Sequence, residues 1–357
     1  QLLDLDRAVS SYAEALGRNP AFAPGVAALD ACVSQPNVAI EARRALADAH
    51  RRGHRPEALA RVLEVTLAEA SEPNTETGSL HTELAYLYLD ALEAPWDSWT
   101  HAQAAYRNAP SAREGIERRN LAVRSGIAAD QRPLLPAFLL QVASSLESDA
   151  ATVERLVADV ALLRDQGYPD GELVPFWEHV LSVDPRHQVA LDTLESRARE
   201  EDAPTRVAQI LKLRIQGDPQ SEHTRHWRIE LADLLAAQGD GGGSIEVLES
   251  LRSENSGDAE AVQRLMGLYR QQGRWEPLLT ILDEEARSES GDTSIDMQIQ
   301  IAEIAVDELE DHSRAVAALE TVLARNPANN DALEIAERLW KQNASGLQPD
   351  NAELNET

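Results

Sequence analysis

Residues 312–327 read HSRAVAALETVLARNP, and residues 6–20 read DRAVSSYAEALGRNP. The two stretches share an alanine-rich apolar pattern and the same Asn-Pro ending, although they lie at opposite ends of the chain. A segment that recurs in this way indicates a chain built from small helical units, because each unit of such an array packs mainly on its neighbours. The sequence therefore predicts a helical repeat array in place of one globular core.

Two anchor positions recur at a nearly constant interval. The helix-ending position recurs at Pro20, Pro110, Pro185, Ser256 and Pro327. A position inside another helix recurs 71 to 75 residues apart, at Leu59, Leu134, Val207 and Leu278. An interval of about 72 residues is close to twice the 34-residue period of a two-helix repeat, so each period contains four helices. The first interval between helix-ending positions is longer by 15 to 19 residues, which predicts one inserted helix, assigned to residues 38–52.

An apolar stripe precedes each helix-ending position. In the last copy it consists of Ala315, Leu319 and Val322, and in the first copy of Ala8, Tyr12 and Ala15. Intervals of four and three residues place such positions on one face of a helix. The other copies read Ser98, Ala102 and Ala105; Leu173, Trp177 and Val180; and Ser244, Leu248 and Leu251. We expect these faces to be buried, with the small first residue allowing a neighbouring helix to approach.

A small residue, a large one, a second small one and a proline at these offsets resemble the second half of the tetratricopeptide repeat (TPR), a 34-residue helix-turn-helix module. The first-helix signature of that family is poorly kept, since its places in the last copy read Ile299, Ala302, Glu303 and Val306. As a whole, the chain resembles bacterial scaffold proteins of divergent TPR type. The resemblance implies an all-α fold, an α-α superhelix or solenoid of tandem antiparallel helical hairpins, and a role in binding proteins.

The repeat pattern also defines the expected domain organisation. Residues 1–342 are predicted to form a single continuous TPR-like solenoid, and residues 343–357 a flexible tail or the start of a linker, because helical periodicity ends there. The triple glycine Gly241–Gly243 is interpreted as a loop in preference to a hinge. The first residue is Gln, so either a leader has been removed or the chain is a piece of a longer protein.

Charge restricts the classes of partner. The chain carries 61 acidic against 33 basic residues, a formal net charge of −28, which repels nucleic acid phosphates and anionic lipid heads. No apolar run reaches the 18 residues of a membrane-spanning helix, so direct membrane insertion is not expected. A cytoplasmic location is slightly favoured, and an exported form with its leader removed stays open.

Known catalytic patterns are absent from the sequence: there is no phosphate-binding loop, dinucleotide fingerprint, zinc-protease pair or nucleophile elbow. The best metal candidate combines His223, His226 and Glu230, but Arg225 and Arg228 lie between them and disfavour a cation. We therefore expect no catalytic, cofactor or metal site, and a protein that is not an enzyme.

One strongly basic stretch and one tryptophan are the candidate partner contacts. The stretch contains Arg43, Arg44, Arg51, Arg52 and Arg55. Guanidinium groups bind carboxylates with two parallel hydrogen bonds, so these residues could hold an acidic partner segment. The alternative, which we favour, is that they pair with acidic helices of the same chain. Trp96 follows Pro95 at an expected helix start and is the aromatic residue predicted to be exposed.

These observations predict a non-enzymatic scaffold or assembly subunit that binds a protein or peptide on the surface of the solenoid, within a larger assembly. The alternative is the recruiting or sensory region of a larger enzyme or regulator whose catalytic part lies outside this chain.

Overall fold

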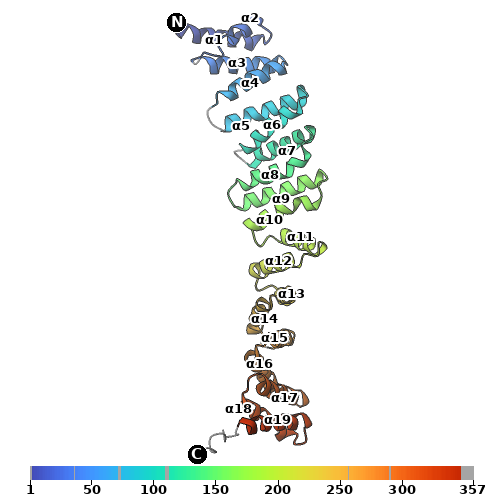
Figure 1. The fold of residues 1–357 in the computed structure, drawn as a ribbon. Helices are drawn as coiled ribbons and strands as arrows, with labels where there is room; N and C mark the ends of the chain where they lie inside the picture. The colour runs from blue at the N-terminus through green and yellow to red at the C-terminus, as the bar shows by residue number, and fades with distance from the viewer. Residues whose placement is uncertain are drawn as a thin grey trace, which may run out of the picture. The chain divides into compact units, whose positions relative to one another are not determined.

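The computed structural model describes residues 2–35, 37–70, 74–108, 112–255, 257–288 and 291–346. Over these residues the chain forms 19 α-helices and two short helical turns, without a β-strand. Neighbouring helices in the sequence pack against one another in antiparallel fashion (Figure 1). The predicted all-α fold of tandem antiparallel helical hairpins is therefore confirmed over these residues.

The helices divide between two compact units, Gln1–Asp184 and Pro185–Thr357. Unit 1 contains α1 (Leu2–Arg18), α2 (Ala23–Asp30), α3 (Ala39–Arg52), α4 (Pro56–Ala68), α5 (Thr75–Tyr86), the π-helical turn η1 (Leu87–Ala91), α6 (Pro95–Arg107), α7 (Ala112–Ala128), the 3-10 turn η2 (Arg132–Leu134), α8 (Leu135–Ser144), α9 (Ala150–Asp165) and α10 (Asp170–Val183). Unit 2 contains α11 (Gln188–Glu200), α12 (Pro204–Gly217), α13 (Thr224–Ala237), α14 (Gly241–Glu254), α15 (Ala259–Gln271), α16 (Trp275–Ser288), α17 (Asp292–Asp307), α18 (His312–Arg325) and α19 (Asn330–Gly346).

A residue in the left-handed conformation ends the first helix of eight successive hairpins, from α3–α4 to α17–α18. These residues have φ between 50° and 83° and lie 34 to 39 positions apart, at His54, Glu93, Asp130, Gly167, Asp202, Gly239, Gly273 and Glu310. Five of them are not glycine, so at these turns the hairpin geometry overrides the steric preference of the side chain. This position, and not the prolines, marks every hairpin from α3 onward.

Hydrogen bonding explains why the left-handed residue recurs. In six of the eight turns, the residue after it donates its backbone N–H to the carbonyl five residues earlier. Arg55 donates to His50 at 3.0 Å, and Asp240 donates to Leu235 at 2.9 Å. This is the Schellman arrangement, which satisfies helix-end carbonyls and turns the chain sharply into the next helix. The turns after η1 and α17 are one residue wider, with Ala94 donating to Tyr88 and Asp311 to Ala305, each at 2.8 Å.

The interpretation of Gly241–Gly243 as a loop is wrong, because these glycines form the first turn of α14. The carboxylate of Asp240 accepts a hydrogen bond from the backbone N–H of Gly243 at 2.8 Å. This contact satisfies one of the N–H groups that a helix start leaves without a partner. Only Gly239 is in the left-handed conformation here, so the capping aspartate directly follows the turn residue.

The apolar stripes are buried in four of the five copies, as predicted. Exposure is at most 4% at every stripe position of α6, α10, α14 and α18. In α1, Ala8, Tyr12 and Ala15 are only partly buried. The small first position permits close approach, because the hydroxyl of Ser98 donates to the carbonyl of Ala85 and that of Ser244 to the carbonyl of Ala232, both at 2.8 Å.

The predicted domain boundaries stay predictions. A helix, α3, occupies the segment assigned to the insertion, and five helix steps separate α1 from α6 where later periods have four. Two of the helix-ending anchors, Pro110 and Ser256, lie outside the described residues. Helix α19 runs to Gly346, and residues 347–357 of the expected tail also lie outside the described residues.

Among the helices that are described, none combines the length and the apolar character needed to cross a bilayer.

Replacing Gly239 with alanine tests the left-handed turn. A Cβ atom at Gly239 would meet no atom within 4 Å, so any penalty comes from the backbone conformation alone. We expect Gly239→Ala to destabilise unit 2 by about 1–2 kcal/mol, measured as a lower urea midpoint by circular dichroism.

Gly267 in α15 supplies a matched control, since a Cβ atom there also meets nothing within 4 Å but the backbone is helical. Gly267→Ala should raise stability by about 0.5–1 kcal/mol. Shifts of the same sign in both variants would contradict this account of the turn.

Candidate functional site

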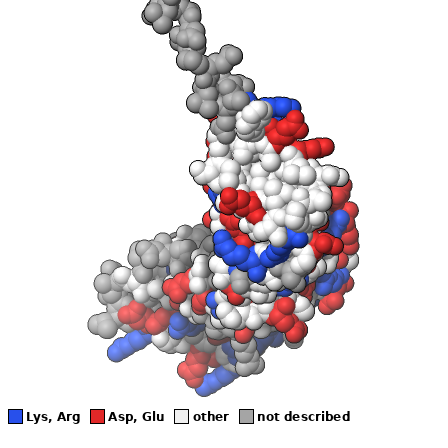
Figure 2. Space-filling view, turned by 90° about the horizontal axis from the view of Figure 1, so that it is seen from below, with Lys and Arg blue, Asp and Glu red and all other residues white. Residues whose placement is uncertain are grey.

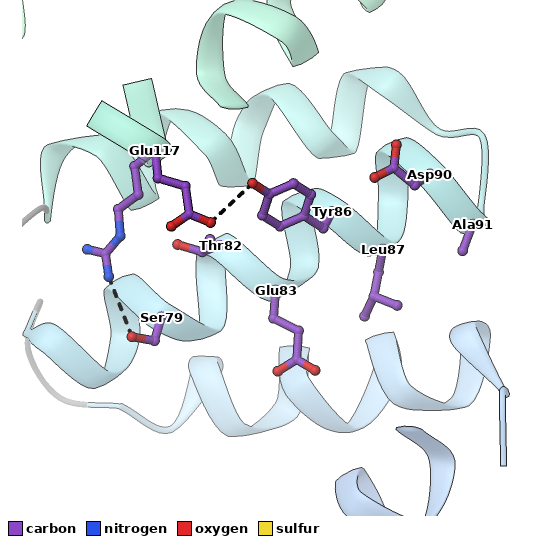
Figure 3. Close-up of a pocket in the computed structure, with 9 residues that line it drawn as sticks. Ser79, Thr82, Glu83, Tyr86, Leu87, Asp90, Ala91 and Glu117 are labelled. Carbon is purple, nitrogen blue, oxygen red and sulfur yellow. Dashed lines mark hydrogen bonds between the residues drawn. The ribbon is translucent and has the colours of Figure 1, made fainter. Parts of the chain in front are cut away.

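An open groove lies in unit 1, where α5 and η1 face α7 (Figure 3). Its volume is about 610 Å3, within the range of small binding sites. The lining residues come from α5, η1 and α7 and are Ser79, Thr82, Glu83, Tyr86, Leu87, Asp90, Ala91, Glu117 and Arg118. The lining is mixed, since it combines hydroxyl groups, carboxylates, one aromatic ring and two aliphatic side chains.

Local sequence explains how α5 presents this lining. Ser79, Thr82 and Tyr86 follow one another at intervals of three and four residues and therefore share a helix face. The helix starts at a capping box, in which Asn74 accepts from the backbone N–H of Thr77 at 2.9 Å and the Thr77 hydroxyl accepts from the N–H of Asn74 at 2.7 Å. This contact fixes the position at which the helix begins, and with it the direction of the lining face.

The π-helical turn η1 continues this face. The N–H of Leu92 donates to the carbonyl of Leu87 at 3.0 Å, five residues back instead of the four of an α-helix. A π-helical turn shifts the side chains that follow it around the helix axis, and such turns are frequent at functional sites. Here the turn contributes Leu87, Asp90 and Ala91 to the groove.

The carboxylates of the groove differ in their ion-pair and hydrogen-bond partners. Arg51 donates to both oxygens of Glu83, at 2.7 and 2.9 Å, and Arg124 pairs with Asp90. Within the part of the chain that the structure describes, Glu117 only accepts a 3.3 Å hydrogen bond from the Tyr86 hydroxyl, and Figure 3 shows these two side chains pointing toward each other. Burial, followed by the charge of Glu117, raises the pKa of Tyr86, so this phenol stays protonated and donates.

The arginine of the described lining, Arg118, is bound by groups of the same chain. Arg118 is 5% exposed and donates to the carbonyl of Asn108 at 2.8 Å, with a longer 3.5 Å contact to the hydroxyl of Ser79. Its side chain therefore helps to join α7 to α5. Hydrogen-bond acceptors dominate the remaining polar surface of the groove.

A pair of histidines lies between α5 and α6. The Nδ1 atoms of His81 and His101 are 2.9 Å apart and the ring centroids 5.2 Å apart, so one ring donates to the other. Tyr88 of η1 stacks on His101 at 5.6 Å, and its hydroxyl donates to Glu64. Burial, followed by the neighbouring imidazole, lowers the pKa of His81 to about 4, and burial also lowers the pKa of His101. Both rings are neutral at pH 7.

The structure gives several of the predicted partner-contact arginines a partner within the chain. Arg43 is 4% exposed, donates to the carbonyl of Ala39 at 3.1 Å and pairs with Glu69 at 2.6 Å. Arg51 pairs with Asp48 at 2.6 Å in addition to Glu83. These contacts agree with the intramolecular alternative.

The other candidates are more accessible. Arg52 is exposed and donates to the carbonyl of Gly17 at 2.8 Å, Arg44 is exposed, and Arg55 is partly buried at the start of α4. Trp96, near the start of α6, is 58% exposed. None of these residues lines the groove, although Arg51 holds one of the residues that do. Their role as partner contacts stays a prediction.

The Arg51–Glu83 pair belongs to a wider pattern, in which ion pairs join the first helix of one hairpin to the first helix of the next. The pairs are Arg51–Glu83, Arg124–Asp90, Arg119–Asp159, Arg199–Glu230, Arg264–Asp233 and Arg338–Asp307. The partners lie 31 to 40 residues apart, about one hairpin. Acidic and basic side chains accordingly lie beside one another on the surface in Figure 2.

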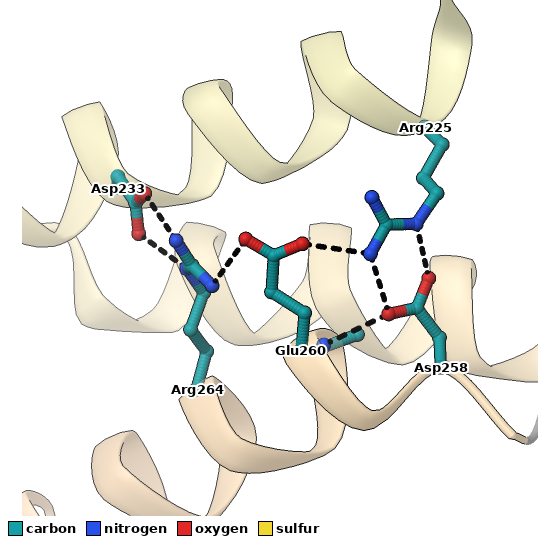
Figure 4. A network of polar contacts seen from close by, with 6 residues as sticks. Arg225, Asp233, Asp258, Glu260 and Arg264 are labelled. Atoms are coloured by element: carbon teal, nitrogen blue, oxygen red, sulfur yellow. Dashed lines mark hydrogen bonds and ion pairs between the residues drawn. The ribbon is translucent and has the colours of Figure 1, made fainter.

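A connected network of such pairs joins α13 to α15 (Figure 4). Arg225 donates to both oxygens of Asp258, at 2.6 and 2.9 Å, and to Glu260 at 2.7 Å. Glu260 also accepts from Arg264 at 3.0 Å, and Arg264 holds both oxygens of Asp233. The hydrogen bond from Arg225 holds the pKa of Asp258 below its usual value. The hydrogen bonds of Arg225 and Arg264 therefore connect two hairpins.

Ion pairs also involve two residues in the segment of the sequence's best metal candidate. Glu230 pairs with Arg199 at 2.7 Å, and Arg225 between the histidines belongs to the network described above. Over the residues that the structure describes, no three His, Cys, Asp or Glu side chains are arranged to hold a metal ion.

A second perturbed group, Asp159 on α9, is completely buried. Arg119 on α7 donates to its Oδ1 at 3.2 Å, while Oδ2 has no hydrogen-bond partner among the described residues. Burial raises the pKa of Asp159 to about 6, against the opposing charges of Arg119 and Arg155. Perturbed carboxyls often mark functional sites, but Asp159 does not line the groove, so we interpret this pair as structural.

Removing Arg119 would leave the Asp159 carboxylate buried without its closest counterion. We expect Arg119→Met to destabilise unit 1 by about 3 kcal/mol, because breaking one side of a buried pair strands the other charge. The double variant Arg119→Met with Asp159→Leu should recover most of this loss in chemical denaturation. A double variant as unstable as the single one would show that the charge is not the cause.

The histidine pair predicts a pH dependence of stability. Their pKa values are lower in the folded chain than the unfolded value of about 6.5, so the unfolded chain takes up protons first as pH falls. The stabilisation is complete above pH 6.5 and is lost as pH falls toward about 4.

Both rings are partly exposed, so we expect the loss between pH 7.5 and 5.5 to be only about 1 kcal/mol. The comparison is with the double variant His81→Gln, His101→Phe, by thermal denaturation at both pH values. An equal loss in wild type and variant would contradict the assignment.

The sequence interpretation missed the groove, the histidine pair and Asp159. Each combines residues of different helices, and the only local signal is the mixed face of residues 79–90. His81 and His101 are 20 positions apart and become neighbours only when α5 packs on α6.

Comparison with known proteins assigns the chain to no family. No protein-family model and no curated protein matches the sequence. The TPR domain of P58(IPK) is 13% identical over 97% of this chain and 99% of that chain, with a TM-score of 0.26. A chain of the Naa15/Naa10 complex bound to HypK-THB is 11% identical over 92% of this chain and 54% of that chain, with a TM-score of 0.31. A TPR protein from Parabacteroides merdae is 14% identical over 74% of this chain and 99% of that chain, with a TM-score of 0.23.

Proposed function

We propose that the protein is a non-enzymatic scaffold that binds a segment of a partner protein in the groove between α5, η1 and α7. The observation that supports this most is the groove itself, an open volume of about 610 Å3 with both apolar and polar lining. Helical repeat arrays offer extended surfaces of this kind for binding. The assignment to the divergent bacterial type of TPR protein rests on the sequence resemblance and is part of the same proposal.

The distribution of arginines supports a binding site at the groove more than at the basic stretch. Arg43 and Arg51 are held by carboxylates of the same chain, so an acidic partner would have to displace Glu69 or Glu83. Displacing a formed ion pair gains little, since a new pair replaces an old one. A binding role for the groove would hold equally if the chain recruits partners for a larger enzyme or regulator.

Filling the groove tests this function. Ala91 is an exposed residue of the lining, so Ala91→Trp places a large side chain in the groove without changing the charge. The variant and the wild type are used to capture proteins from an extract of the source organism, with quantitative mass spectrometry. We expect at least one partner to be reduced by about fivefold or more, and its purified form to bind about tenfold more weakly in calorimetry.

Ala317→Trp on α18 is the matched control, because Ala317 is also an exposed alanine but lies in the other unit. It should capture the same partners as the wild type, and circular dichroism should show unchanged helix content in both variants. If Ala91→Trp captures and binds every partner as the wild type does, the groove is not the binding site.

A further inference from the structure

Glu117 is the carboxylate of the groove that no cation of the described residues neutralises. Glu83 and Asp90 each hold an arginine, Arg51 and Arg124, from a neighbouring first helix. Glu117 is exposed, and its Oε1 accepts only the long 3.3 Å bond from Tyr86. The Oε2 atom of Glu117 has no hydrogen-bond partner among the described residues, so this oxygen is available to a ligand.

The surroundings of Glu117 favour a donor-rich, positively charged group. Tyr86 brings an aromatic ring to the groove, and aromatic rings attract guanidinium and ammonium groups. Thr82 adds a hydroxyl oxygen on the same helix face, while Arg118 donates to the carbonyl of Asn108 and makes a longer contact with the hydroxyl of Ser79. A carboxylate that receives charge-assisted hydrogen bonds beside an aromatic ring holds a cation in place.

Apolar contact is available next to this position. Leu87 and Ala91 line the groove on η1, one and five residues after Tyr86. Figure 3 shows Leu87 and Ala91 on η1, to the right of the Tyr86–Glu117 pair. A ligand that places a cation at Glu117 can therefore place an aliphatic side chain against η1.

We infer that the groove recognises a partner segment in which an arginine or lysine, bound by Glu117 and Tyr86, stands next to an aliphatic residue that contacts Leu87 and Ala91. This inference rests on the proposed function and names the chemistry of the partner at the same site. The net charge of −28 supports it, because a negative field attracts basic segments and increases their association rate.

A random dodecapeptide phage library selected on the wild-type chain tests the inference, with counter-selection on Ala91→Trp. We expect the selected peptides to contain an arginine or lysine next to a leucine, isoleucine, valine or methionine. Calorimetry then compares a synthetic selected peptide with the same peptide carrying glutamine at the basic position.

Two substitutions separate charge from shape. Glu117→Gln keeps the size of the side chain and should weaken binding of the basic peptide about tenfold, the usual effect of losing one charge-assisted hydrogen bond. It should not weaken the glutamine peptide further, because the two changes remove the same contact. Tyr86→Phe keeps the ring and should leave affinity within about twofold. Glu320→Gln on α18 is the control for loss of one negative charge outside the groove, and should have no effect.

The outcomes distinguish the inference from the function on which it rests. Some selected peptides could lose binding to Ala91→Trp and yet carry no basic residue, or bind Glu117→Gln as tightly as wild type. Either result would overturn the inference and leave the groove as a binding site. No peptide or partner that depends on Ala91 would overturn both. Equal weakening of peptide binding by Glu117→Gln and Glu320→Gln would show that the net charge of the chain, and not a contact with Glu117, causes the loss. This result would also overturn the inference.

Discussion

The left-handed residue after each first helix from α3 to α17 is the constraint on which these hairpins depend. It allows the next N–H to bond back to the helix end, and it reverses the chain within a few residues. The second helix then returns along the first, so that small residues such as Ser98 and Ser244 meet its backbone. The turn recurs every 34 to 39 residues, and the repeat length follows from it.

The interval between hairpins also explains how the chain uses its charges. Residues about one hairpin apart come to lie on adjacent first helices, and arginines at these positions meet carboxylates. Exposed ion pairs of this kind contribute little individually, but a connected network such as Arg225–Glu260–Arg264 restricts how two hairpins can move against each other. Acidic residues outnumber the basic ones, and carboxylates such as Glu117 have no cation partner among the residues that the structure describes.

The groove and the histidine pair share an element, the π-helical turn η1. Its residues Leu87, Asp90 and Ala91 line the groove, while Tyr88 stacks on His101 on the other side. The shape of the groove therefore depends on packing between α5 and α6. In contrast, the buried pair of Arg119 and Asp159 joins α7 to α9 without contributing to the lining.

The sequence by itself determined most of the buried helix faces, because these depend on residues three to four positions apart in one helix. It also determined the four-helix period, because the helix-ending positions recur along the chain. The stripe at Ala315, Leu319 and Val322 could be predicted in this way, and its burial was confirmed. The sequence misplaced Gly241–Gly243, because a glycine run has the same composition in a loop as in a capped first turn. It also could not identify Asp130 or Glu310 as left-handed, since nothing in these side chains requires that conformation.

Only the tertiary structure decided which charged side chains have partners within the chain and where a ligand could bind. Arg51 meets Glu83 across 32 residues, and Tyr86 meets Glu117 across 31. Such contacts depend on how far each hairpin is rotated against the previous one, and no local pattern of the sequence encodes that rotation. The sequence therefore predicted a binding scaffold, and the stacking of its hairpins supplied the groove.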